Sequence, residues 1–216
     1  MKLKGAIFDM DGTLLDSMSA WEEYKRYIVN EVLGYYEKSI NITTQTTREV
    51  VDELKSRFNA DITENDVEIF ANNFLKPYYE NEAKLKEGAF DFLNTLSQNG
   101  VKMAVATATK REVFGDVLKN LGIDKFFDTV LTCSDVGKGK SDPLVYFTAI
   151  DKIGCDPRDI WVFEDSVVAI RTCKKAGLKV CAVEDRFNSA SGEEIMEISD
   201  CYIKTFDDLK NTSIIF

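Results

Sequence analysis

Two aspartates near the start of the chain have the types and spacing expected of a catalytic pair. Asp9 and Asp11 follow the apolar segment 3–8, which is typical of a buried strand. Gly12 comes next and lets the backbone bend sharply, and Thr13 adds a hydroxyl. Burying two neighbouring carboxylates costs free energy unless a cation or a proton lies between them. We therefore interpret the pair as a metal-holding, chemically active site rather than as an acidic turn after a strand.

Further polar side chains follow three other segments that have the composition of buried strands. Because ligands bind at the carboxyl ends of the strands of an open parallel sheet, we expect these side chains to converge on Asp9 and Asp11. They are Thr107 and Ala108 after segment 101–106, Lys138 and Lys140 after segment 129–132, and Glu164 and Asp165 after segment 160–163.

The expected cluster suits phosphoryl transfer assisted by a metal. Carboxylate oxygens of Asp9, Asp165 and Glu164 are the ligands that Mg²⁺ prefers, and a lysine supplies a second positive charge. Thr107 and the backbone N–H groups at a helix start can hold a phosphate. An aspartate can attack phosphorus to form an aspartyl phosphate, and Asp11 is placed to protonate the leaving oxygen and then to deprotonate a water.

Each residue also has an ordinary structural interpretation. Thr107 could be a loop hydroxyl, segment 164–166 could cap a following helix, and Lys138 and Lys140 could be solvated loop lysines. The functional interpretation depends on their expected convergence at one edge of a sheet.

The elements that must position these residues alternate between strand and helix over most of the chain. Strands are predicted at 3–8, 101–106, 129–132, 160–163 and 179–183, with weaker structure at 201–203. Helices are predicted at 89–98, 110–120, 143–153, 167–176 and 193–198. Alternation with short connections predicts an α/β fold with a doubly wound parallel sheet.

A helical block separates the first predicted strand from the second. Its helices are predicted from residue 19 to about Gly34, at 47–58, and from Thr63 onward, with Pro77 bending or ending the last one. The block is far too long for a loop. We therefore predict a Rossmann-like core formed by residues 1–15 and 85–216, and an inserted all-helical cap domain formed by residues 16–84.

Composition limits the chemistry and the partners. The net charge is −10 with no basic stripe, which argues against nucleic acid and anionic membranes as partners. There is no histidine, so acid–base catalysis must use carboxylates, lysine or cysteine. No apolar run approaches the roughly 20 residues that span a bilayer, and we see no secretion signal. The five cysteines are scattered, which fits a reducing cytosol, and we expect a cytoplasmic protein.

Together the motifs resemble those of the haloacid dehalogenase-like hydrolases over nearly the whole chain. Segment 9–17 resembles the first family motif, segment 105–107 the second, Lys140 with Pro143 the third, and segment 164–166 the fourth. The helical block is similar to the small cap of the β-phosphoglucomutase-like branch. The resemblance also implies that strand 3–8 lies in the middle of the sheet.

The resemblance implies a role for each matching residue. Asp9 would be the nucleophile and Asp11 the acid–base, and Thr107 and Lys140 would hold the phosphoryl group. The implied ligands of Mg²⁺ are Asp9, Glu164, Asp165 and the backbone carbonyl of Asp11.

Two departures from the family pattern bear on function. Two residues separate Lys140 from Pro143, where the family usually has proline directly after the lysine, so Lys138 stays a competing candidate. The mutase branch uses a histidine in the first cap helix, whereas this chain has none and Trp21 lies near that place. We therefore expect a Mg²⁺-dependent phosphatase acting on a small phosphomonoester, with a sugar-phosphate mutase or a non-catalytic phosphate-binding module as alternatives.

The cap is expected to carry the substrate specificity. Arg48 is the cap cation that we expect to contact the substrate, although it could equally be a helix-surface arginine. The expected partner is a small phosphorylated metabolite, such as a sugar phosphate, and a monomer is the default state. Hinges near 15–17 and 82–88 would let the cap close and exclude water.

Overall fold

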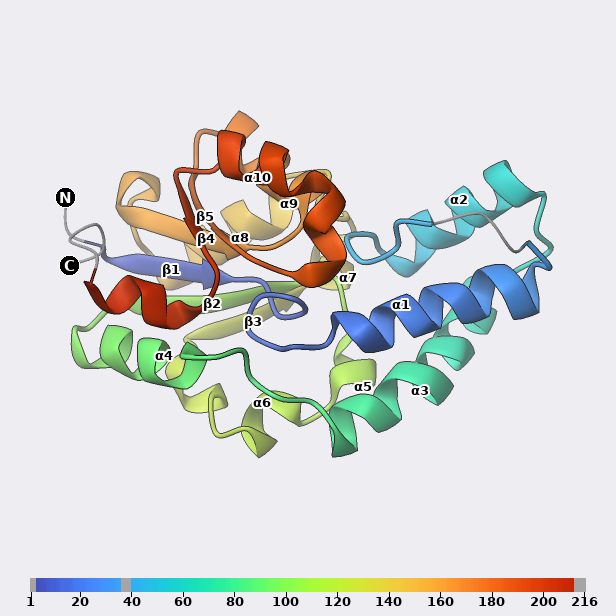
Figure 1. Cartoon of the computed structure of the whole chain (residues 1–216), viewed down its shortest axis with the longest axis horizontal. Helices are drawn as coiled ribbons and strands as arrows, with labels where there is room; N and C mark the ends of the chain where they lie inside the picture. Colours follow the sequence, from blue (N-terminus) through green and yellow to red (C-terminus); the bar gives the residue numbers. More distant parts are fainter. Residues whose placement is uncertain (1–2, 36–39, 212–216) are drawn as a thin grey trace.

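A parallel sheet of six strands forms the centre of the computed structural model, which describes residues 3–35 and 40–211 (Figure 1). The strand order is β3-β2-β1-β4-β5-β6, and all neighbours are parallel. The strands are β1 (Gly5–Phe8), β2 (Lys102–Thr107), β3 (Thr129–Thr132), β4 (Ile160–Glu164), β5 (Lys179–Val183) and β6 (Cys201–Ile203). The predicted doubly wound α/β fold is confirmed, with β1 in the middle of the sheet.

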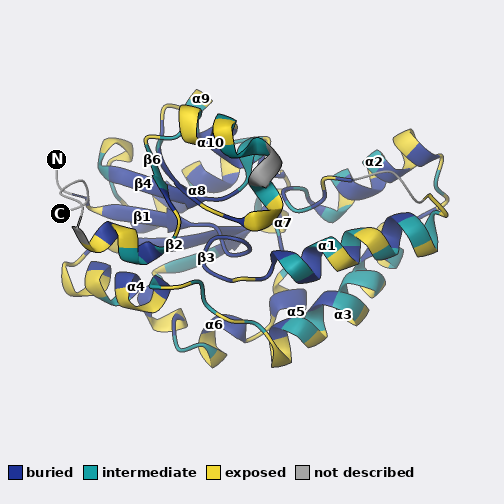
Figure 2. Cartoon of the chain, viewed as in Figure 1, coloured by how far each residue is buried: buried dark blue, intermediate teal, exposed yellow. Residues whose placement is uncertain are grey.

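Helices cover both faces of the sheet (Figure 1). One face carries α4 (Ala89–Gln98), α5 (Arg111–Phe114) and α6 (Val117–Asn120). The other carries α8 (Leu144–Ile153), α9 (Val167–Lys175) and α10 (Gly192–Ile198), and α7 (Cys133–Val136) follows β3 directly. Because side chains alternate along a strand, Phe8 of β1 belongs to the first layer and Ile7 to the second. The central strands β1 and β4 are accordingly buried on both sides, whereas the edge strands β3 and β6 are partly exposed (Figure 2).

The chain between β1 and α4 is helical and extends from one end of the sheet (Figure 1). It contains α1 (Met18–Arg26), its π-helical continuation η1 (Tyr27–Val32), α2 (Thr47–Phe58) and α3 (Glu64–Asn81). Residues 18–35 and 40–82 contain no strand, as predicted. The division into a core and a cap at residues 15–16 and 84–85 stays a prediction.

Local sequence explains where α2 and α3 begin. Thr46 accepts a hydrogen bond from the backbone N–H of Glu49, and the Glu49 side chain accepts one from the Thr46 N–H. Thr63 and Asp66 form the same reciprocal cap at the start of α3. The predicted bounds of α2 are confirmed, and its apolar side chains are buried as expected.

Three details differ from the predicted elements. The single helix predicted at 110–120 is two short helices, because Gly115 between them has φ +52°, which is incompatible with a continuous helix. Pro77 lies inside α3, which continues for another turn to Asn81. The first helix changes to π geometry at Tyr27, and this change has no obvious signal in the sequence. None of the described helices is long and apolar enough to cross a membrane.

An aromatic cluster joins the central strands to the end of the chain. Phe8 stacks on Phe163 of β4 at 4.6 Å between ring centroids. Phe206, in the 3-10 helix η5 (Phe206–Asn211), stacks on Phe92 of α4 at 5.3 Å and lies 6.1 Å from Phe163. Packing between these rings holds η5 and α4 against one face of the sheet.

Truncating this cluster should cost much more stability than truncating an exposed ring. We expect Phe206→Ala to lower the free energy of unfolding by about 3–5 kcal/mol, because the ring is buried. Phe90 also contacts another ring, Phe126, but is 40% exposed, so Phe90→Ala should cost about 1 kcal/mol. Urea unfolding curves of both variants measure the difference, and equal losses would contradict this account of the core.

Candidate active site

The loop after β1 places both aspartates at the carboxyl edge of the sheet. The Asp9 N–H donates to the Phe163 carbonyl at 2.9 Å, which extends the β1–β4 pairing by one residue. Gly12 has φ +83°, and a Cβ at this position would collide with the carboxylate of Asp165. Only glycine therefore lets the loop approach Asp165 so closely. Asp9 and Asp11 are both buried, as the sequence predicted.

Lys140 supplies the positive charge beside Asp9. Its ammonium group forms ion pairs with Asp9 and Glu164, and the residue is only 1% exposed. Burial by itself would lower the pKa of Lys140, but the two adjacent carboxylates raise it above its usual value. Lys138, the competing candidate, is exposed. The Lys140 backbone N–H donates to the Thr44 carbonyl at 2.7 Å, so a contact with the helical segment fixes this loop.

Asp9, Glu164 and Asp165 form a buried group of carboxylates. One oxygen from each lies within 4.8 Å of the others. Burial raises the pKa of Asp9 to about 8, although Lys140 opposes this shift. Burial and the charges of Asp9 and Glu164 also raise the pKa of Asp165 well above its usual range. Three ionised carboxyl groups would have more negative charge than Lys140 balances, which is why the pKa values are raised, and their oxygens are the donors that a hard divalent cation prefers.

Glu164 is held by donors at both of its oxygens. Oε1 accepts from Lys140 and from the Tyr146 hydroxyl, the latter at 2.9 Å. Oε2 accepts from the backbone N–H groups of Asp165 and Ser166, at 3.1 and 3.2 Å, directly before α9. These bonds compensate for the complete burial of the carboxylate and fix its position relative to Lys140.

Asp165 is oriented by two neutral side chains. The Thr13 hydroxyl donates to one oxygen at 3.2 Å, and the Asn188 amide donates to the other at 2.6 Å. Thr13 comes from the loop after β1, and Asn188 from the 3-10 helix η4 (Arg186–Ser191) after β5. The ends of three strands, β1, β4 and β5, therefore contribute to the position of this carboxylate.

Asp11 accepts three hydroxyl hydrogen bonds, each 2.6 Å long. Ser17 and Tyr79 donate to Oδ1, and Thr109 donates to Oδ2. Tyr79 lies in α3, so a hydroxyl from the helical segment reaches the loop after β1. Burial and the nearby Asp11 raise the pKa of Tyr79 well above its usual value, so its hydroxyl is a hydrogen-bond donor.

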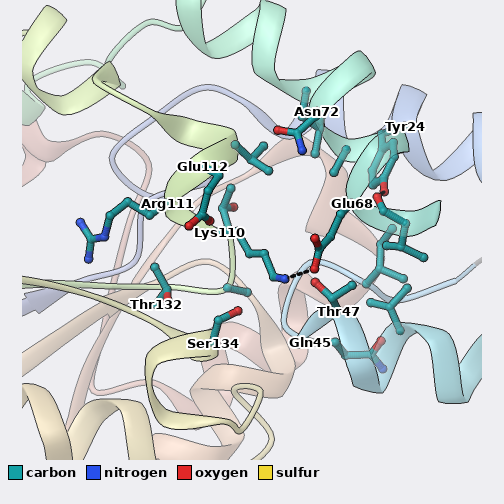
Figure 3. A pocket seen from close by; sticks show the side chains of 18 of the residues that line it. Tyr24, Gln45, Thr47, Glu68, Asn72, Lys110, Arg111, Glu112, Thr132 and Ser134 are labelled. Atoms are coloured by element: carbon teal, nitrogen blue, oxygen red, sulfur yellow. Dashed lines mark hydrogen bonds and ion pairs between the residues drawn. The ribbon is translucent and has the colours of Figure 1, made fainter. Parts of the chain in front are cut away.

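A cavity of about 440 Å³ lies between the helical segment and the loops that follow β2 and β3 (Figure 3). Trp21 and Tyr24 line it from α1, and Glu68 and Asn72 from α3. On the sheet side, Lys110 projects into it and forms an ion pair with Glu68 (Figure 3). The cavity combines aromatic, amide and charged groups, but Asp9, Asp11, Lys140, Glu164 and Asp165 do not line it. Thr109, which lines the cavity and donates to Asp11, connects it to the loop after β1.

The remaining predicted site residues lie at different places. Thr107 ends β2 and is buried, and its oxygen accepts from the Thr109 N–H at 3.0 Å. Ala108 lines the cavity. Arg48 is exposed and lines a separate hollow with Lys110 and Lys138. The structure therefore brings Thr107 and Ala108 to the same region as the acids and Lys140, but it does not bring Arg48 into the cavity.

Five residues that donate hydrogen bonds to the site carboxylates were not identified as site residues from the sequence. Ser17 and Thr109 stand within or beside the quoted motifs, and their hydroxyls were a usable signal. Tyr79 and Asn188 stand far from any motif, and Tyr146 follows Pro143 of the third motif by three residues. The two tyrosines read as ordinary apolar positions of helices, and Asn188 lies in an irregular segment.

The family follows from a match over most of the chain. Residues 6–183 match the family described as haloacid dehalogenase-like hydrolase. The chain belongs to this family. The predicted resemblance to this family is thereby confirmed.

The names of similar proteins are consistent with this family. The chain is 31% identical over 183 residues to validoxylamine A 7'-phosphate phosphatase from Streptomyces hygroscopicus subsp. limoneus, covering 81% of this chain and 83% of that protein. It is 27% identical to a phosphorylated carbohydrates phosphatase from Thermotoga maritima, covering 82% and 83%. These phosphatases confirm the predicted class of enzyme, a phosphoric monoester hydrolase of this family.

Solved structures show the same fold. The β-phosphoglucomutase from Clostridium difficile superposes with a TM-score of 0.76 at 18% identity, covering 97% of this chain and 94% of that chain. A hydrolase from Pseudomonas syringae has a TM-score of 0.79 at 19% identity. At these identities the likeness establishes the fold alone.

Removing the buried ammonium group should destabilise the fold, and removing its exposed neighbour should not. We expect Lys140→Met to lower the free energy of unfolding by about 3–5 kcal/mol, because it leaves buried carboxylates without their partner. Lys138→Met should change it by less than about 0.5 kcal/mol. Chemical denaturation at neutral pH without divalent cations measures both, and a Lys140→Met variant as stable as Lys138→Met would contradict the proposed charge balance.

Proposed function

We propose that this chain is a Mg²⁺-dependent phosphatase that hydrolyses small phosphomonoesters through an aspartyl phosphate on Asp9. The observation that carries the proposal is the buried group of Asp9, Glu164 and Asp165 around Lys140. Thr109, which donates to Asp11, connects this region to a cavity of about 440 Å³. A hydrolase with this arrangement can hold a phosphoryl group at the carboxylates and the rest of the substrate in the cavity.

Asp9 is the proposed nucleophile. Its carboxylate lies at the end of the central strand, and Lys140 keeps one oxygen in place. Lys140 can also pair with an oxygen of the phosphoryl group, which reduces the repulsion between two anions that must approach each other. Thr107, buried at the end of β2, is the proposed hydroxyl contact of the same group.

Asp11 is the proposed acid–base residue. It protonates the leaving oxygen while the bond from Asp9 to phosphorus forms, and it then removes a proton from the attacking water. Its position two residues after Asp9 and beside Thr109, which lines the cavity, supports this role. Such a position would let Asp11 face the leaving group of a substrate bound in the cavity.

The carboxylate group fits Mg²⁺ by the number and type of its donors and by its unbalanced charge. Asp9, Asp165 and the backbone carbonyl of Asp11 are the proposed ligands, together with Glu164. When bound there, Mg²⁺ would neutralise carboxylate and phosphoryl charge. Thr13 and Asn188 keep Asp165 turned toward the site, and Tyr146 helps to keep Glu164 in place.

The cavity indicates where the alcohol part of the substrate binds. Ala108 and Thr109 lie at its sheet side, and the amides of Gln45 and Asn72 at its helical side can bind hydroxyl groups (Figure 3). A polyhydroxylated leaving group fits this lining, and one relative is a phosphorylated carbohydrates phosphatase. Arg48, which lies outside the cavity, is not needed for this binding mode.

Release of phosphate from a panel of phosphomonoesters tests the activity. We expect free phosphate in the presence of Mg²⁺ and none after chelation of divalent cations, with sugar phosphates among the best substrates. Chromatography of the products separates hydrolysis from the mutase alternative. An isomerised sugar phosphate as the main product, without free phosphate, would overturn the proposal.

The same assay tests the nucleophile. Asp9→Asn should lower kcat by at least about a thousandfold, because the amide is not a nucleophile, while the fold is retained. Asp61→Asn is the matched control, since Asp61 is an exposed aspartate between α2 and α3. Near-normal turnover by Asp9→Asn with Mg²⁺ present would contradict the mechanism.

A further inference from the structure

Two helices of the cap region converge on the carboxylate of Asp11 through Tyr79. The Tyr79 hydroxyl, from the last turn of α3, donates to Asp11 Oδ1 at 2.6 Å. The same oxygen of Tyr79 accepts the indole N–H of Trp21, from α1, at 3.0 Å. Both rings are buried, so water does not compete for these hydrogen bonds.

We propose that Tyr79 is a positioning residue that sets the orientation of the Asp11 carboxylate when α1 and α3 are packed against the core. This inference rests on the proposed function, in which Asp11 transfers protons to and from the reacting oxygens. Tyr79 itself does not touch the reacting atoms in this role. It acts through the carboxylate that does.

The geometry around Asp11 explains why a third donor matters. The torsion that turns the plane of an aspartate carboxylate is broad, so its hydrogen bonds define its orientation. Ser17 and Tyr79 donate to Oδ1, and Thr109 to Oδ2. Ser17 precedes α1 directly and is only six residues from Asp11, whereas Tyr79 and Thr109 hold the carboxylate from two segments that are distant in sequence.

Through Tyr79, the orientation of the Asp11 carboxylate also depends on the packing of the cap helices α1 and α3. Thr109 follows β2 and belongs to the sheet region, so its hydrogen bond does not require α1 or α3. Tyr79 and Trp21 are carried by α3 and α1, which follow the first strand and precede α4. Packing of these helices therefore completes the set of donors around Asp11 at the same time as it encloses the cavity.

A neighbouring tyrosine provides a matched control for the simple loss of a contact between cap and core. The Tyr78 hydroxyl donates to the backbone carbonyl of Asp16 at 2.7 Å, and no side chain of the proposed machinery takes part. Tyr78→Phe thus removes one hydroxyl hydrogen bond between α3 and the segment after β1. Tyr79→Phe removes two, the bond to Asp11 and the bond from the indole N–H of Trp21. Only Tyr79→Phe removes a bond to Asp11.

The experiment compares two substrates that depend differently on proton donation to the leaving oxygen. With Mg²⁺ present, kcat/KM is measured for the best alkyl phosphomonoester found by phosphate release and for p-nitrophenyl phosphate, whose leaving group departs with little protonation. We expect Tyr79→Phe to lower kcat/KM for the alkyl ester by about tenfold or more, because general acid catalysis is worth about a hundredfold or more and depends on orientation. For p-nitrophenyl phosphate the loss should stay below about threefold. Tyr78→Phe should affect both substrates equally and weakly.

Three results would overturn the inference. Equal losses for both substrates would show that Tyr79 acts only by fixing the cap, and a faster Tyr79→Phe variant would show that it restrains Asp11 in an unproductive orientation. No loss for either substrate would remove any role for the hydroxyl.

Two further measurements keep the test decisive. Thermal unfolding of both tyrosine variants verifies that they fold. Trp21→Phe, which keeps the bond from Tyr79 to Asp11 but removes its support, should show the same substrate selectivity in kcat with a smaller loss. For this variant kcat is compared because Trp21 also lines the cavity and its replacement can change KM. A wild-type chain that hydrolyses neither substrate would instead contradict the proposed function itself, so the two failures are distinguishable.

Discussion

Buried carboxylates that share the ammonium group of Lys140 are the constraint on which the rest of the structure depends. Asp9, Glu164 and Asp165 come from the ends of two adjacent strands, and parallel pairing forces them to the same edge. Their burial is tolerable only because donors surround them: Lys140, a tyrosine, two backbone N–H groups, a threonine and an amide. In the proposed mechanism, the carboxylates that Lys140 does not neutralise give the site its affinity for Mg²⁺ and its reactivity toward phosphorus.

The helical segment completes the site rather than merely covering it. It contributes one wall of the cavity, including Glu68, whose ion pair with Lys110 crosses from α3 to the loop after β2. It also contributes the Thr44 carbonyl that fixes the backbone of Lys140, and the Tyr79 hydroxyl on Asp11. An enzyme built in this way can recognise the alcohol part of a phosphomonoester and arrange its acid–base residue with the same set of helices.

The parts that the sequence predicted are those set by strand topology and local chemistry. Asp9, Glu164 and Asp165 directly follow apolar strands, so the parallel sheet determines where they meet. Two predictions failed or stayed open, for different reasons. The choice between Lys138 and Lys140 depends on a loop whose backbone is fixed by Thr44. The separate α5 and α6 arise from the positive φ of Gly115, which an otherwise helical pattern hides. The role of Tyr79 could not be predicted, because the sequence of a helix does not show which carboxylate one of its tyrosines contacts.

The central claim is that Asp9 becomes covalently phosphorylated during turnover. The most direct measurement is to quench the enzyme in acid while it hydrolyses a good substrate with Mg²⁺, and to examine its peptides by mass spectrometry after borohydride reduction, which converts a phosphorylated aspartate to homoserine. The account predicts one phosphoryl group, located on the peptide that contains Asp9, and homoserine at that position after reduction. Turnover without any covalent phosphoryl group, or with the group on another residue, would contradict it.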